Sequence, residues 1–234
     1  MRIERRGDHI WIRGAIVDNR PHAHDALQLV ASAAAGPEAQ LQLEHGREHG
    51  RLFVIPSRER HALALHDGVV ALVNPSSPLA ATLRRRWLTT EGAARVCAPP
   101  LTASDDPCER LSEMLATVEQ TPHDPRVRRV LQWVDELERR GCWRELTLTR
   151  AAQQVALSPS RLRHLFKAEV GSPWRSYLVW RRALAALTLA AQGTPLTSAA
   201  HATGYADSAQ LSRQFAQLFG LTPSTVLRRA NFTQ

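Results

Sequence analysis

The chain of 234 residues carries 30 basic and 22 acidic residues, a formal net charge of +8 and three cysteines. Its length favours two modest domains, each with a core of its own. The few cysteines argue against a disulfide framework, and no apolar run approaches the length of a membrane span. The first 20 residues carry charges throughout and lack an apolar leader, so we expect a cytoplasmic protein.

The charge is distributed unevenly along the chain. Residues 1–123 hold 14 arginines and 15 acidic residues, whereas residues 124–234 hold 16 basic and 7 acidic residues. The positive excess therefore lies entirely in the second half. A domain this basic predicts a polyanionic partner, and nucleic acid is favoured over a membrane surface because the charges are interspersed within helical patterns.

Residues 1–75 predict a small antiparallel β domain. Short segments of alternating polarity, such as HIWIRGAIV, RLFVIP and HALALH, are separated by glycine, proline and charged residues. Residues 76–123 change to helical spacing and predict a helical connector, with one helix starting at Asp106 and Pro107. The amphipathic segments of this connector could cover the β domain or pair with a second copy of the chain.

Everything in residues 124–234 has helical spacing, and one unit occurs there twice. LTRAAQQVALSPSRLRHLFKAEVG (148–171) aligns with LTSAAHATGYADSAQLSRQFAQLFG (196–220), with one extra residue in the second turn. Each copy predicts a short helix with a small alanine face, a tight turn and a longer second helix, which is a helix-turn-helix. We place the two subdomains at about 146–171 and 195–220. PWRSYLVWRRALAALTLAAQG predicts the helix that joins them, about 18 residues and roughly 27 Å long.

The outer faces of the two longer helices carry side chains that hydrogen-bond to bases and phosphates. The first face has Ser160, Arg161, Arg163, His164 and Lys167, and the second has Gln210, Ser212, Arg213, Gln214 and Gln217. Neither face carries an acidic residue that would repel the DNA backbone. A single face of this kind is more often an ordinary solvated surface, but two copies in a strongly basic domain favour DNA binding.

Residues 126–230 closely resemble the DNA-binding domain of the AraC/XylS family of bacterial transcriptional regulators. The segment GYADSAQLSRQFAQLFGLTPS follows the family signature, and SPSRLRHLFKAEVGSPWRSYL matches the other half of the domain. The resemblance implies two helix-turn-helix subdomains that bind promoter DNA and usually activate transcription through RNA polymerase. By position, it implies base contacts at Ser160, Arg163, His164, Ala209, Gln210 and Arg213, and phosphate contacts at Arg161, Lys167 and Gln214. An alanine at 209 can offer a base only an apolar contact, such as one with a thymine methyl group.

The family commonly places a cupin-like β-barrel before this domain, and RPHAHDALQLV with IPSRERHALAL resembles such a sensor in shortened form. Metal-binding cupins carry His-x-His followed by a glutamate, and later Pro-x-Gly-x-x-His. This chain has, at the matching positions, His22, His24, Gln28, Pro56, Arg58 and His61. Glutamine replaces the usual carboxylate, and arginine replaces a glycine that normally serves a turn.

Residues 22, 24 and 28 would share one face of a single strand, and a neighbouring strand could bring His61 alongside. Three imidazoles with an open fourth position would suit zinc, nickel, copper or iron(II). The same histidines could instead hydrogen-bond a small organic effector, or simply pack in the barrel.

We therefore expect an α+β multidomain protein: a small antiparallel cupin-like β-barrel (1–75), a helical connector (76–123) and an all-α DNA-binding domain (124–234). The predicted function is a sequence-specific transcriptional regulator, not an enzyme, that responds to a small-molecule or metal effector. A second copy of the chain is a candidate partner, in a homodimer. Two alternatives stay open at this point. One is a metal-dependent cupin enzyme with an attached DNA-binding domain, and the other is a dimeric regulator without an effector.

Overall fold

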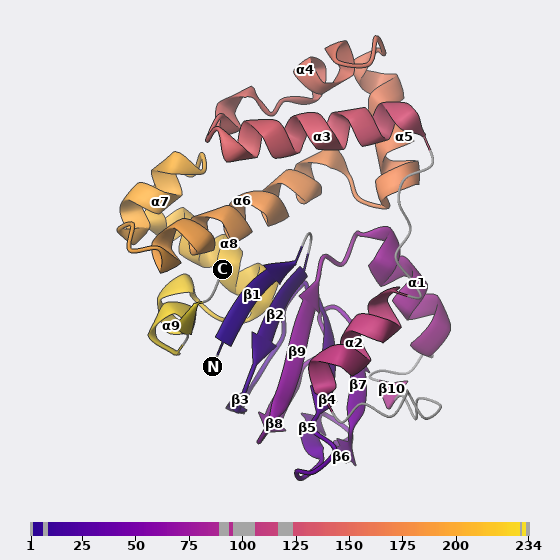
Figure 1. The fold of residues 1–234 in the computed structure, drawn as a ribbon, viewed down its shortest axis with the longest axis vertical. Helices are drawn as coiled ribbons and strands as arrows, with labels where there is room; N and C mark the ends of the chain where they lie inside the picture. Colours follow the sequence, from indigo (N-terminus) through magenta and orange to yellow (C-terminus); the bar gives the residue numbers. More distant parts are fainter. Residues whose placement is uncertain are drawn as a thin grey trace. The chain divides into compact units, whose positions relative to one another are not determined.

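The computed structural model describes residues 2–6, 9–88, 94–95, 106–116, 124–229 and 231–232. By contact the chain divides into two units: residues 1–75, 79–119 and 215–234 form the first, and residues 76–78 and 120–214 form the second. Figure 1 shows that strands dominate the first unit and helices the second. None of the described helices is both long and apolar enough to cross a membrane.

Two β-sheets form the centre of the first unit. Among the described residues, the larger has the strand order β10-β7-β4-β9-β2-β1-β11 and the smaller has the order β3-β8-β5-β6. All pairs are antiparallel except β1 with β11. The strands are β1 (Arg2–Arg6), β2 (His9–Arg13), β3 (Ile16–His22), β4 (Leu27–Ser32), β5 (Ala39–Leu43), β6 (Gly46–Gly50), β7 (Leu52–Ile55), β8 (His61–Leu65), β9 (Gly68–Val73), β10 (Ala94–Arg95) and β11 (Asn231–Phe232).

The central strands β4 and β9 are buried on both faces, which explains their nearly continuous apolar sequences. One face, with Leu29 and Ala71, packs in a cluster with Leu83 and Leu111 of two helices, α1 (Pro78–Trp87) and α2 (Pro107–Ala116). Figure 1 shows α2 lying across this sheet. Because side chains alternate along a strand, Gln28 and its alternate neighbours point to the opposite face of the sheet.

The predicted antiparallel β region followed by helices is confirmed. The described strands make two separate hydrogen-bonded sheets, with no ladder between them that closes a cupin-like barrel. The predicted helix at Pro107 is present as α2, and Leu111 and Leu115 bury its apolar stripe against the sheet core. In this packing the helices of the connector cover the β domain, which is one of the two roles that the sequence left open for them.

The second unit contains the predicted helices. They are α3 (Pro125–Arg139), the short turn η1 (Trp143–Glu145), α4 (Leu148–Gln153), α5 (Pro159–Val170), α6 (Trp174–Ala191), α7 (Leu196–Ala202) and α8 (Ser208–Phe219), and the chain continues into α9 (Pro223–Arg229). The side chains of Asp124 and Ser158 accept hydrogen bonds from the first turns of α3 and α5, as their sequences predict. Ser172 also precedes a proline but does not cap a helix: α6 starts after Pro173, which has no side chain that can cap.

The linker helix α6 has the predicted length of 18 residues, and Trp174, Tyr177 and Trp180 are buried in it as core residues. Arg181 is also buried, at 8% exposure. Its guanidinium donates to the carboxylates of Asp135 and Glu138 on α3. A buried arginine without such partners would cost several kcal/mol, so this network fixes α3 against α6.

The two helix-turn-helix copies differ at one turn position. Gly204 in the second copy has φ +85°, and the equivalent residue of the first copy, Ala156, has φ 52°. Left-handed backbone places the alanine Cβ too close to the following carbonyl, whereas glycine adopts it without that penalty.

We therefore predict opposite effects from exchanging these two residues. Ala156→Gly should raise the free energy of unfolding by about 1 kcal/mol, and Gly204→Ala should lower it by a similar amount. A Cβ at 204 meets its nearest atom at 3.7 Å, so the backbone conformation alone is tested there. Urea denaturation followed by circular dichroism measures both, and two changes of the same sign would contradict the prediction.

Candidate functional site

The first predicted recognition helix, α5, exposes the predicted DNA-contacting residues. Ser158 Oγ accepts a hydrogen bond from the backbone N–H of Arg161 at 3.2 Å and so sets the start of the helix. Leu162 and Phe166 are fully buried, which turns the other side of the helix outward. The exposed residues on that side are Ser160, Arg161, Arg163, His164 and Lys167.

The second recognition helix, α8, has the same construction. Leu211 and Phe215 are buried, Ala209 and Arg213 are exposed, and Gln214 is half-buried. The backbone N–H of Gln210 donates to Asp207 Oδ1 at 2.6 Å, so Asp207 caps the start of this helix.

Gln210 has a second role in the structure. Its side-chain oxygen accepts a hydrogen bond from the backbone N–H of Ala206 at 2.9 Å. The amide oxygen of Gln210 is therefore used to stabilise the helix start. Its NH₂ group remains to donate to a base acceptor, and its oxygen keeps a second lone pair.

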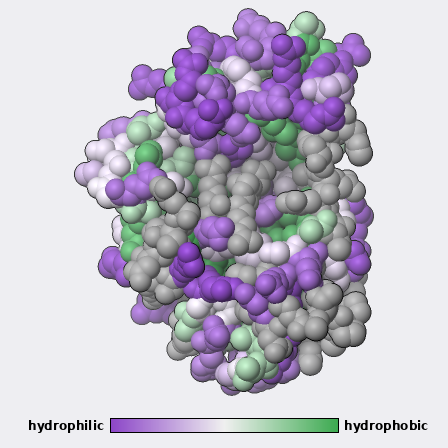
Figure 2. Space-filling model, viewed as in Figure 1, coloured by the Kyte–Doolittle hydropathy of each residue, from purple (hydrophilic) through white to green (hydrophobic). Residues whose placement is uncertain are grey.

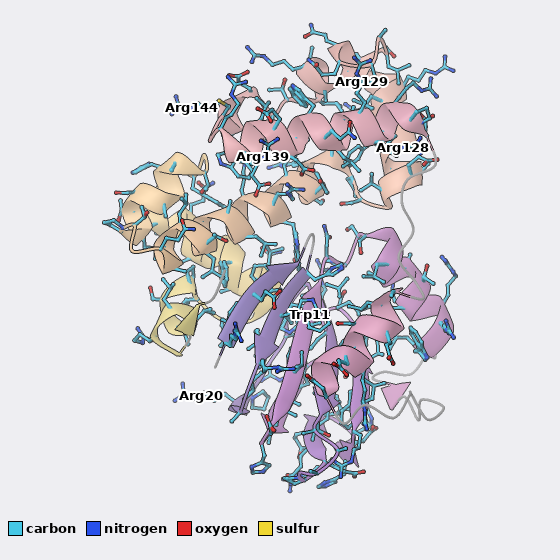
Figure 3. All side chains as sticks on the ribbon, viewed as in Figure 1. Trp11, Arg20, Arg128, Arg129, Arg139 and Arg144 are labelled. Atoms are coloured by element: carbon cyan, nitrogen blue, oxygen red, sulfur yellow. The ribbon has the colours of Figure 1, made fainter. Side chains whose placement is uncertain are left out.

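Exposed arginines extend the positive surface beyond the two recognition helices. Arg128, Arg129 and Arg139 project from α3, and Arg144 projects from η1 (Figure 3). Figure 2 shows hydrophilic residues over much of the visible surface of these helices. The charge excess of residues 124–234 indicated such a surface without naming these residues, which lie outside the repeated motif.

A histidine cluster lies in the first unit. His22 ends β3 and pairs directly with His61 at the start of β8, after a register irregularity between Asp18 and His22. Opposed residues of an antiparallel pair share a face, so the two rings approach, with centroids 4.8 Å apart. The His24 ring lies 5.6 Å from that of His22 and 5.3 Å from that of His61.

The predicted single strand through residues 22, 24 and 28 is wrong. The chain leaves the smaller sheet after His22 and enters the larger one at Leu27, so His24 lies in the connection between them. His24 nevertheless reaches Gln28, whose side-chain oxygen lies 2.9 Å from its Nε2. The four predicted residues therefore do come together, but from two sheets and a loop.

The rings are held by backbone carbonyls two residues away in the chain. Nδ1 of His22 lies 3.1 Å from Arg20 O, Nδ1 of His24 lies 3.1 Å from Ala26 O, and Nδ1 of His61 lies 2.9 Å from Glu59 O. Since a carbonyl only accepts, Nδ1 carries the proton in each neutral ring, and Nε2 carries the lone pair. Burial lowers the pKa of His24 below its usual 6.5, which favours the neutral ring at neutral pH.

A family model described as a helix-turn-helix domain matches residues 151–229. The arabinose operon regulatory protein of Escherichia coli (strain K12) is 34% identical over 108 residues, which are 44% of this chain and 35% of that protein. Its Salmonella typhimurium namesake is 33% identical over 107 residues, 44% of this chain and 36% of that protein. The second half of the chain therefore contains a helix-turn-helix domain similar to that of the AraC/XylS family.

The match to this AraC-type domain begins within α4 and ends with α9, so it includes both recognition helices. The chain spans about a third of the length of the curated relatives named above. Among solved structures, ToxT from Vibrio cholerae O395 aligns with 94% of this chain and 96% of its own, at 13% identity and a TM-score of 0.48.

The carboxyl end of α8 belongs to the same unit as the histidines, which the sequence did not reveal. The backbone N–H groups of Asp25 and Ala26 donate to the carbonyls of Gln217 and Leu218 at 2.8 and 2.9 Å. The Gln217 side chain donates in turn to Asp25 Oδ2 at 3.1 Å. The last carbonyls of a helix have no partners within it, so the 23–26 connection caps this helix end.

Gly220, the glycine of the AraC-type signature, follows directly with φ +77°. A Cβ there would lie 2.5 Å from Cδ2 of His22 and 3.0 Å from Cδ2 of His24. Glycine is therefore required at this position both by the backbone conformation that ends α8 and by the closeness of the imidazoles.

The arginine that replaces the expected glycine at 58 adopts the glycine conformation. Arg58 has φ 66°, and its backbone N–H donates to the carbonyl of His24 at 2.7 Å. Its side chain is exposed and forms an ion pair with Asp25 at 2.9 Å. The turn expected from the glycine position is thus present, with a strained residue in it.

We predict that Arg58→Gly is more stable to unfolding than Arg58→Ala by about 1 kcal/mol. Both variants lose the exposed ion pair with Asp25, so the difference between them isolates the cost of left-handed backbone at this turn. Thermal or urea unfolding measures it. Equal stabilities would show that the turn relaxes to negative φ when the side chain is shortened.

Proposed function

We propose that this chain is a sequence-specific transcriptional regulator that reads promoter DNA with α5 and α8 and takes a signal in its β domain. The observation that carries the proposal is the duplication. Two helix-turn-helix copies, each with a buried apolar side, expose equivalent polar faces free of acidic residues. An ordinary solvated helix surface would carry acidic as well as basic residues, so two polar faces without acidic residues favour DNA binding.

The linker helix supports reading of DNA by both copies at once. Its 18 residues span about 27 Å, and successive major-groove faces on one side of B-DNA recur at about 34 Å. A rigid rod of this length separates two recognition helices by close to one helical turn. The expected operator therefore has two short contacted segments about 10 base pairs apart.

The residues divide into base readers and phosphate binders. Arg163 and Arg213 can each donate two hydrogen bonds to guanine O6 and N7, and Ala209 can contact a thymine methyl group. His164, Ser160 and the NH₂ group of Gln210 offer further base contacts. Arg161, Lys167 and Gln214 are assigned to phosphates, which fix the register of the protein on DNA without reading sequence.

The regulatory part of the proposal concerns the first unit. We expect the regulator to act in the cytoplasm, to recruit RNA polymerase as an activator, and to respond to an effector bound near His22, His24, Gln28 and His61. Turnover of a substrate is not expected there, because the cluster lacks the carboxylate of the metal-binding cupin motif.

DNA binding by single-residue variants tests the assignment. Operators selected from random DNA by the full chain supply the specific probe. Arg213→Ala should weaken binding to that operator by about 1–3 kcal/mol and leave binding to unrelated DNA nearly unchanged. Lys167→Ala should weaken both and reduce the slope of log affinity against log salt by about one.

The matched control is Arg47→Ala, which removes an exposed arginine of β6 in the β domain and should alter neither affinity nor slope. Fluorescence anisotropy across a salt series gives all of these quantities. If Arg213→Ala kept full discrimination between the operator and unrelated DNA, α8 would not be a recognition helix.

A further inference from the structure

The histidine cluster has the arrangement of a metal site rather than that of a packed core. One ring nitrogen from each of His22, His24 and His61 lies within 4.8 Å of the other two. His24 and His61 are only 3% and 1% exposed, whereas His22 is half-buried. Three imidazoles therefore converge on one point, and His22 is the most exposed of the three.

We propose that the Nε2 atoms of His22, His24 and His61 bind one divalent transition-metal ion, and that this ion controls the 23–26 connection that caps the carboxyl end of α8. The metal site stands on the geometry of the first unit alone. The control of DNA binding rests on the proposed function.

The hydrogen bonds of the rings select the right nitrogen for a metal. All three Nδ1 atoms lie within hydrogen-bonding distance of a backbone carbonyl, at 2.9 to 3.1 Å. Metal-binding histidines typically donate their second ring N–H to a carbonyl or carboxylate, which fixes the ring and makes the other nitrogen a better ligand.

The distances fit a site that closes by a small movement. Metal–nitrogen bonds of about 2.0–2.1 Å in tetrahedral geometry place ligand nitrogens roughly 3.3 Å apart. The ligand nitrogens would therefore approach one another by up to about 1.5 Å when a metal binds. Three neutral nitrogen donors suit zinc, nickel, copper or iron(II) and do not suit calcium or magnesium, which prefer oxygen.

Gln28 completes the surroundings of the site. A neutral His24 has one N–H, yet its two nitrogens lie 3.1 Å from Ala26 O and 2.9 Å from Gln28 Oε1. One proton cannot serve both oxygens, and Nδ1 lies at the carbonyl of Ala26, so the Gln28 side chain lies beside the nitrogen that would bind the metal. Gln28 thus occupies the position from which a carboxylate would bind the metal directly.

The connection between the ligands links the site to α8. Asp25 and Ala26, whose N–H groups bind the carbonyls of Gln217 and Leu218, follow His24 directly in the chain. An ion bound by His24 would restrain this connection, and Gly220 lies against two of the three rings. The helix α8 carries both this capped carboxyl end and the predicted DNA-contacting residues.

Zinc titration of the metal-free full chain, followed by calorimetry, tests the site. We expect one Zn²⁺ per chain, and we expect His22→Gln to weaken binding at least tenfold. His22 is half-buried, so this variant should keep its fold, which circular dichroism checks. His49→Gln, at an exposed position of β6, is the matched control and should bind as the original chain does. Less than one zinc per chain, or equal affinity in His22→Gln, would overturn the site.

Gln28→Glu supplies a test in the opposite direction. Without metal, a buried carboxylate should lower the melting temperature. With zinc, the added ligand should strengthen binding about tenfold, so zinc should raise the melting temperature of the variant more than that of the original chain. Equal shifts in the two proteins would exclude Gln28 from the surroundings of the metal.

Operator binding with zinc and with a chelator tests the control of α8. We expect zinc to change operator affinity in the original chain and in His49→Gln but not in His22→Gln, and the operator to change zinc affinity by the same factor. Zinc binding without any effect on the operator would overturn the control and leave the site. Zinc binding without binding of any operator would refute the proposed function instead.

Discussion

Burial of the linker helix α6 is the constraint on which any two-site reading of DNA by this chain depends. From α6, Trp174, Tyr177, Leu178 and Ala185 pack in the core of the first helix-turn-helix, and Ala186 packs with Ala200, Tyr205 and Leu211 in the core of the second. One helix therefore belongs to both cores. Neither core can rotate against the other without breaking α6 or exposing apolar surface.

Two arginines of α6 reinforce this arrangement. Arg181 binds the carboxylates of α3, and the neighbouring Arg182 donates to the carbonyl of Trp143 and packs beside the turn at Gly204. Burial raises the pKa of Tyr205 in that turn to about 12, so its hydroxyl stays neutral beside the guanidinium. Contacts within the second unit thus extend from the first copy through the linker to the turn of the second.

The helical half could be predicted from the sequence because its signals are local and occur twice. Caps such as Ser158 and Asp207, and apolar residues three and four apart, fix where a helix starts and which side it buries. The left-handed turn at Ala156 has no signal of its own in the sequence, because alanine disfavours this backbone conformation. Only the glycine at the equivalent position 204 indicates it. Ser172 does not cap α6, although Ser158, which also precedes a proline, does cap α5.

The histidine site was predictable in composition but not in construction. Period-two alternation holds only within a strand, and the chain changes sheets between His22 and Leu27. The convergence depends on the pairing of His22 with His61 and on a loop held by the backbone of Arg58, neither of which leaves a local signal. The contact with Gly220 joins residues almost 200 positions apart, and in the sequence that glycine indicates only the end of a helix.

The strength of the contact at the carboxyl end of α8 limits the change in affinity that a ligand at the histidines can cause. Two backbone hydrogen bonds, from Asp25 and Ala26, and one side-chain hydrogen bond, from Gln217, join the connection to the helix. Each contributes about 1 kcal/mol net, and the exposed side-chain bond contributes the least. A ligand that made or released all three hydrogen bonds would change the free energy of the contact between the 23–26 connection and α8 by about 2–3 kcal/mol. This change lies within the range of typical allosteric coupling. Such a coupling changes an affinity by roughly 30- to 150-fold, so these hydrogen bonds are strong enough for regulation yet weak enough for a bound ion to shift the equilibrium.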